Sequence, residues 1–206
     1  MATVARNDGV RDWAAVYERE VFPFVERPSR YINCEINSRP PRADARLRVA
    51  LVFPDAYEVG ISHLGLKILY TILNDMPGVA AERCYMPRAD AEAILRRHQI
   101  PLCTLESARP LREFHIIGFS VQHELCYTNL LAILDLAGIP LSSAERHGRP
   151  QPLIIAGGNI YNPAPLEAFI DAFALGDGED TIRHIAEWAL DIIARTGALT
   201  PDMTLL

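Results

Sequence analysis

The sequence has only four cysteines, and none of them lies close to another. Cys34, Cys84, Cys103 and Cys126 are separated by 50, 19 and 23 positions. Structural metal sites usually use closely spaced thiols, and disulfides are rare in the reducing cytosol. We therefore expect four free thiols that are either buried as small apolar side chains or without a role, with no disulfide and no metal site.

Long apolar runs are also absent. No uninterrupted stretch reaches the ~18 apolar residues that indicate a transmembrane helix. The N-terminal stretch MATVARNDGVRDW has no apolar signal segment. We expect a cytoplasmic protein without a membrane partner. The formal net charge of −6 disfavours nucleic acid as a partner.

Several familiar catalytic and nucleotide-binding motifs are missing. The sequence contains neither GxxxxGK[ST] nor GxSxG, and PDAYEVG stands where a GxGxxG would follow the first predicted strand. These absences argue against a P-loop protein, a dinucleotide-binding Rossmann domain and an α/β-hydrolase.

Strand and helix patterns alternate from residue 47 onwards. Apolar runs predict strands at 47–53, 79–86, 114–120, 152–158 and 171–177. Helical periodicity predicts helices at 61–75, 89–99, 124–137 and 179–195. This alternation predicts an α/β fold with a flavodoxin-like, doubly wound, parallel five-stranded sheet of strand order 2-1-3-4-5.

The N-terminal segment has a different character. Residues 1–46 offer one or two short helical turns and then a stretch rich in Pro, Ser, Asn and Arg. We predict an extended and partly helical arm with its linker at 1–46, the α/β domain at 47–197 and a C-terminal tail at 198–206. The arm is too polar to form a core of its own, which favours a docking role.

Polar residues and glycines gather in the loops that follow the predicted strands. In such a sheet, ligands bind beyond the carboxyl ends of the strands. The candidate binding residues in these loops are Asp55, Tyr57, Glu58, Gly60, His63, Ser120, Gln122, Gly157, Gly158, Asn159 and Gly176. Such residues are also compatible with turn formation and helix capping, although the topology favours a ligand-binding face. His63 fits a helix cap, a core residue or a pocket group, and a metal site at His123 and Glu124 would need further ligands.

Three of these loops carry a family resemblance. The pattern D-x-H-x-x-G, typical of cobalamin-binding domains, stands here as residues 55–60, DAYEVG. A Ser after the third strand matches Ser120 in GFSVQ, and paired glycines after the fourth match Gly157–Gly158 in IIAGGN. Over roughly residues 30–190 the chain resembles the N-terminal, cobalamin-binding-type domain of radical S-adenosylmethionine (SAM) proteins.

The resemblance implies a cobalamin-binding-like fold and a corrinoid ligand, with one departure. Tyr57 stands where the family's cobalt-ligating His would be. A phenol, with a pKa near ~10, is a poor neutral ligand compared with imidazole. The resemblance therefore implies either cobalamin bound without a histidine below the cobalt, or a pocket that no longer binds it.

The resemblance also implies a second, catalytic domain. In the family that domain holds a [4Fe–4S] cluster on CxxxCxxC and binds S-adenosylmethionine, and the motif is absent here. We expect this chain to be non-catalytic alone, as a fragment or a split-encoded partner of a radical SAM catalytic domain or chain. Two alternatives stay open: a non-binding docking scaffold, and a stand-alone enzyme that uses Tyr57, Glu58 or His63 as acid–base groups.

Overall fold

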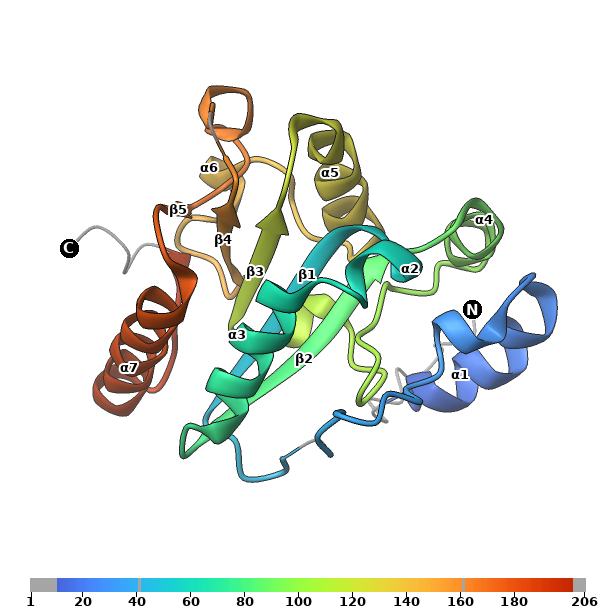
Figure 1. Ribbon diagram of the computed structural model, residues 1–206, viewed down its shortest axis with the longest axis horizontal. Helices are drawn as coiled ribbons and strands as arrows, with labels where there is room; N and C mark the ends of the chain where they lie inside the picture. Colours follow the sequence, from blue (N-terminus) through green and yellow to red (C-terminus); the bar gives the residue numbers. More distant parts are fainter. Residues whose placement is uncertain (1–10, 41, 161, 202–206) are drawn as a thin grey trace, which may run out of the picture.

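A computed structural model describes residues 11–40, 42–160 and 162–201. The first ten residues of the expected arm and the last five of the expected tail lie outside the described residues. Five parallel strands form one sheet in the order β2-β1-β3-β4-β5 (Figure 1). The strands are β1 (Leu47–Ala56), β2 (Val79–Met86), β3 (Ile116–Val121), β4 (Leu153–Gly158) and β5 (Ala172–Ala174). The predicted flavodoxin-like α/β fold and its strand order are confirmed.

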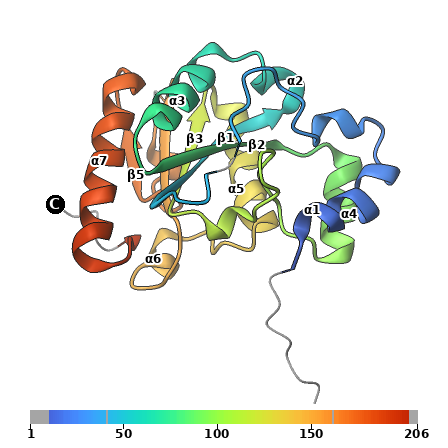
Figure 2. The ribbon, with the colours of Figure 1, turned by 90° about the horizontal axis from the view of Figure 1, so that it is seen from below.

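Helices cover both faces of the sheet (Figure 2). Helices α3 (Leu64–Asp75) and α7 (Gly178–Thr196) lie on one face, and α4 (Ala89–His98) and α5 (Tyr127–Leu136) lie on the other. Alternate side chains of β1 point to opposite faces, as the two-residue period of a strand requires. Leu51 and Phe53 pack on the α3 and α7 side, whereas Ala50 and Val52 pack on the α5 side.

The loop after β1 differs from its prediction. Strand β1 continues to Ala56, past an irregularity in its pairing with β2 after Phe53, and a short helix α2 (Tyr57–Gly60) follows. The next helix, α3, starts at Leu64 and not at residue 61. His63 explains this start, because its Nδ1 accepts a hydrogen bond of 3.1 Å from the backbone N–H of Leu66. His63 is therefore the N-cap of α3.

The N-terminal arm packs onto the α/β domain. It contains α1 (Trp13–Glu20) and two 3₁₀ turns, η1 (Phe22–Phe24) and η2 (Pro28–Arg30). Val16 and Tyr17 are buried in the same apolar cluster as residues of α4 and α5. The Tyr17 hydroxyl donates to the carbonyl of Pro101 at 3.0 Å and accepts from the N–H of Cys103 at 3.2 Å. The apolar side chains of the arm are thus buried in the core of the α/β domain.

The loop at 101–110 runs beside β2, which forms one edge of the sheet. Leu105 donates its N–H to the carbonyl of Arg83 at 2.9 Å, and Arg83 donates its N–H to Glu106 at 2.7 Å. The side chains of Arg83 and Glu106 also form an ion pair at 2.7 Å, with exposed fractions of 1% and 0%. The outer edge of β2 is therefore occupied by protein groups at this point.

The remaining short elements connect the layers. They are η3 (Leu111–Glu113), η4 (Glu124–Cys126), α6 (Ser143–Arg146) and η5 (Ala164–Leu166). Within the ranges that the structure describes, no helix combines the length and apolar character needed to cross a bilayer.

Candidate functional site

A cavity of about 240 Å³ lies at the carboxyl ends of β3 and β4, between the sheet and helices α3 and α7. We call it the α3/α7 slot. Its walls are apolar side chains from both helices and the sheet, among them Leu66, Leu69, Ile155, Ile182 and Ile185. The slot lies where the topology of a doubly wound sheet places a ligand.

Seven of the candidate residues from the sequence line this slot. They come from the ends of β3 and β4 and from the segments after β1, β3, β4 and β5, and they are His63, Ser120, Gln122, Gly157, Gly158, Asn159 and Gly176. The fold therefore brings together residues that lie more than a hundred positions apart in the chain.

The paired glycines keep the end of β4 flat against its neighbours. Gly158 has φ of +110°, and a Cβ added there would lie 2.3 Å from the carbonyl oxygen of Val121. Only glycine fits that backbone and that spacing. A Cβ at Gly157 would lie 3.4 Å from Ala174, which is ordinary contact. Gly158 is thus required by the geometry at the mouth of the slot.

A chain of polar groups links the ends of β3 and β4 across the mouth. The Gln122 amide donates to the Ser120 hydroxyl at 3.3 Å, and the Asn159 amide donates to the Gln122 carbonyl oxygen at 3.4 Å. The Asn159 N–H also donates to the carbonyl of Val121 at 2.9 Å. The slot therefore combines an apolar interior with a polar rim, as ligand pockets typically do.

Helix α7 points its N-terminus at the slot. Gly178 and Glu179 line the cavity, and the first turn of any helix leaves backbone N–H groups without intrahelical partners. Such a terminus attracts anions. Glu179 and Asp180 in that turn also complement the positive end of the helix dipole.

The other four candidate residues do not line the slot. Tyr57 donates its hydroxyl to the Glu35 carboxylate of the arm, and its ring meets the edge of Tyr85 at a centroid distance of 5.5 Å. Burial, together with the bond to Glu35, raises the pKa of Tyr57 to about 12, so the phenol is neutral at physiological pH. Glu58 accepts a hydrogen bond of 2.6 Å from Arg30, which is 5% exposed. Tyr57 and Glu58 thus tie the arm to the loop after β1.

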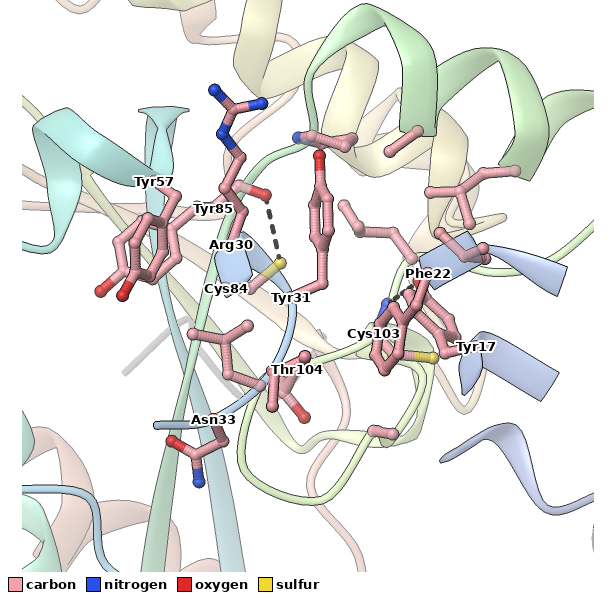
Figure 3. Close-up of a pocket in the computed structure, with 18 of the residues that line it drawn as sticks. Tyr17, Phe22, Arg30, Tyr31, Asn33, Tyr57, Cys84, Tyr85, Cys103 and Thr104 are labelled. Atoms are coloured by element: carbon pink, nitrogen blue, oxygen red, sulfur yellow. Dashed lines mark hydrogen bonds between the residues drawn. The ribbon is translucent and has the colours of Figure 1, made fainter. Parts of the chain in front are cut away.

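Tyr57 lies at a second cavity of about 240 Å³, between the arm and the end of β2 (Figure 3). Tyr85, Tyr31 and Cys84 also line it. Gly60 lies under the Tyr85 ring, because a Cβ there would come within 2.5 Å of that ring. Tyr57 and His63 thus line different cavities, Tyr57 the one beside the arm and His63 the α3/α7 slot.

The sequence does not predict the apolar walls of the slot. Leu69, Ile182 and Ile185 follow the ordinary periodicity of an amphipathic helix, which does not distinguish a cavity wall from a packed core. Gly118 in the middle of β3 offered a usable signal, because a glycine inside a strand often marks a close approach. A Cβ there would lie 3.6 Å from Leu51, on the slot side of the sheet.

Comparison with known proteins identifies the family. A family model described as "Radical SAM proteins, N-terminal" matches residues 65–198. The chain belongs to this family. The matched range of this radical SAM N-terminal domain includes Ser120 and Gly157–Gly158, whereas residues 55–63 precede it. The resemblance inferred from the sequence is therefore confirmed at the level of the family.

Solved structures are similar to this chain. One of them is a novel cobalamin-binding protein from Desulfitobacterium hafniense DCB-2, with a low sequence identity of 18% and a TM-score of 0.41. The match covers 70% of this chain and 60% of that protein's chain. No curated protein matches this radical SAM N-terminal domain.

Proposed function

We propose that this domain binds a corrinoid without a protein histidine on its cobalt and presents it to a radical SAM catalytic domain or chain. That partner would carry the [4Fe–4S] cluster and S-adenosylmethionine. The observation that supports the proposal most is the α3/α7 slot, which opens beside Gly158 at the strand ends. The nucleotide tail of the corrinoid would occupy this slot.

The size and chemistry of the slot suit such a tail. Ligand pockets usually measure ~300–1,000 Å³, and about 240 Å³ is room for a planar base but not for a whole corrinoid. Leu69, Ile182 and Ile185 would pack against the base. Ser120 and Asn159 at the rim would hydrogen-bond to the sugar and phosphate of the tail.

The residue at the family's ligand position does not favour coordination. The Tyr57 hydroxyl donates a hydrogen bond to the Glu35 carboxylate, and the pKa of the phenol is raised to about 12. A neutral phenol is a weak donor to a metal compared with imidazole. When bound, the corrinoid would supply the cobalt chemistry, and this chain would hold and orient it.

Exposed apolar side chains around the strand ends support a partner surface. Val59, Leu64, Leu125 and Leu175 are 50%, 69%, 85% and 73% exposed. They follow β1, β3 and β5, so the parallel topology brings them to the same edge of the sheet. Apolar groups gathered at one face commonly mark an interaction site. We propose that the catalytic domain covers this edge.

A visible absorption titration of the purified chain with hydroxocobalamin tests the proposal. The blocking variant is Gly118→Leu, whose side chain would project into the slot. The matched control is Ala194→Leu, which adds the same side chain at an exposed position of α7, outside the slot. We expect the native chain and the control to retain the chromophore on gel filtration, and the blocked chain to lose it.

The spectrum tests the ligand mode separately. We expect the native complex to lack the signature of an imidazole ligand, and Tyr57→His serves as the comparison. An imidazole-type spectrum from the native chain would refute the histidine-free mode. If native chain at micromolar concentrations binds no hydroxocobalamin, the corrinoid proposal fails as a whole.

The second candidate is a docking scaffold that binds no corrinoid. The exposed apolar edge favours it as much as it favours a corrinoid domain, because either would be covered by a partner. The slot at the strand ends favours the corrinoid domain. Failure of the titration, with a folded native chain, would support the scaffold.

A further inference from the structure

Three possible metal ligands of different kinds meet at the ends of β1 and β3. They are the carboxylate of Asp55, the imidazole of His123 and the thiol of Cys126. Their ligand atoms all lie within 4.8 Å of one another. Asp55 belongs to β1, whereas His123 directly precedes the turn η4 that follows β3, and Cys126 is the last residue of that turn. The fold, and not sequence spacing alone, brings the three together.

The distances suit one small ion. The Cys126 sulfur lies 3.5 Å from His123 Nδ1 and 3.6 Å from Nε2. In tetrahedral zinc sites, metal–ligand bonds of ~2.0–2.3 Å put the ligand atoms roughly 3.3–3.8 Å apart. The imidazole and thiol have that separation, but the sulfur is almost equally far from both ring nitrogens, so the ring must turn to aim one nitrogen at an ion shared with the sulfur. The Asp55 carboxylate, whose oxygen lies within 4.8 Å of both groups, would also have to rotate toward the ion.

The protein backbone holds these groups in place. The Asn129 amide on α5 donates to the carbonyl of Pro54 at 3.1 Å, which fixes the end of β1 against the helix that starts beside Cys126. Cys126 itself is buried, with 2% exposed, and His123 is exposed. The site therefore has a buried inner side and an open outer side.

No ion pair among the described residues neutralises the carboxylate of this cluster. None of the ion pairs formed by those residues includes Asp55. The thiol has only the His123 ring as a polar side-chain partner among them. A bound cation would satisfy a carboxylate, an imidazole and a thiolate at once.

We propose that Asp55, His123 and Cys126 bind one Zn²⁺ ion, with a fourth position open on the solvent side. Zinc takes oxygen, nitrogen and sulfur ligands together, and three protein ligands with one open position are typical of sites that bind an exchangeable ligand. The site is separate from the α3/α7 slot, since none of its three residues lines that slot. It does not depend on corrinoid binding.

The test is metal titration of the full chain after chelator treatment. Calorimetry with Zn²⁺ measures affinity and stoichiometry, and Co²⁺ as a substitute reports thiolate ligation through a charge-transfer band. We expect one ion per chain and a tetrahedral Co²⁺ spectrum. Each of His123→Ala, Asp55→Asn and Cys126→Ser should weaken binding at least tenfold, because even the loss of an outer-shell partner costs ~10–100-fold.

Two matched controls replace the same residue types elsewhere. Cys34→Ser changes an exposed thiol, and His184→Ala changes an exposed imidazole on α7. Both should bind Zn²⁺ as the native chain does, and only Cys126→Ser should abolish the charge-transfer band. Because His123 is exposed, His123→Ala should fold even if Cys126→Ser does not. The proposal is overturned if the native chain binds no Zn²⁺, or if His123→Ala binds it with native affinity.

Discussion

The buried ion pair between Arg146 and Asp171 gives the sharpest prediction of stability. The Arg146 side chain is fully buried and Asp171 is 1% exposed, with 2.8 Å between Nη2 and Oδ1. Arg146 also donates at 2.8 Å to the carbonyls of Pro140, Leu141 and Phe169. One guanidinium thus joins α6 and its flanking loops to the segment before β5.

Asp171→Asn would leave this guanidinium without a counter-charge. The second carboxylate oxygen of Asp171 accepts the N–H of Ile154 in β4 at 2.7 Å, so an amide there would face two donors with one acceptor. Removing one partner of a buried pair costs ~3–5 kcal/mol. That is a large share of a total stability of ~5–15 kcal/mol. With a urea slope of ~2 kcal/mol per molar, the midpoint should fall by ~1.5–2.5 M.

Urea unfolding followed by circular dichroism measures this change. The control Asp191→Asn removes one partner of an exposed pair with Arg195 on α7, where the two side chains are 59% and 63% exposed. Such helical surface pairs contribute only ~0.3–0.5 kcal/mol. If Asp171→Asn costs no more than this control, Arg146 does not need its counter-charge and the reasoning is wrong. The double variant Arg146→Met, Asp171→Leu should lose less free energy of unfolding than the sum of the losses from the two single variants.

Three further changes test other parts of the structure. Gly158→Ala should lower the thermal midpoint by several degrees, because its Cβ would meet the Val121 carbonyl at 2.3 Å; an unchanged midpoint would contradict that spacing. Burial lowers the pKa of His115, so the folded state holds the ring neutral. The contribution of His115 to the free energy of unfolding should therefore stay constant above pH ~6.5 and fall as pH drops below it. His115→Gln should reduce the fall in urea midpoints measured between pH 7.5 and 5. Glu58→Gln should remove the charge opposite Arg30 in the 2.6 Å bond, leaving Arg30 its 3.8 Å pair with Glu26, and should make the arm a faster target in limited proteolysis. An unchanged cleavage rate would show that the pair with Glu58 does not hold the arm.

The sheet could be predicted from the sequence because its strands carry local signals. The limits of β2 match the predicted 79–86, since Pro77 and Gly78 precede it and Pro87 follows it. The start of α3 was predicted three residues early. Isoleucine at 61 fits the helical period, but the His63 side chain competes for the first free N–H and sets the boundary at Leu64.

Only part of the candidate site could be predicted in the same way. Ser120 and Gly158 stand at strand ends, so the topology alone brings them to the slot. The partners of Tyr57 and Glu58 are Glu35 and Arg30, at 22 and 28 positions away in a segment without periodicity. No local pattern predicts such contacts. For the same reason, the sequence does not predict that Asp55 lies close to His123 and Cys126.

The covering of β2 has a consequence for how this domain associates with other chains. An uncovered edge strand offers a row of unpaired N–H and C=O groups on which another strand can add, which leads to aggregation. Here the loop at 101–110 forms hydrogen bonds with the backbone N–H and C=O groups of Arg83 at the outer edge of β2. The strand at the opposite edge of the sheet, β5, spans only Ala172–Ala174. Both edges therefore resist growth of the sheet from one molecule to the next. The partner domain proposed above would then contact the loops that follow the strands, and side chains rather than backbone pairing would select it.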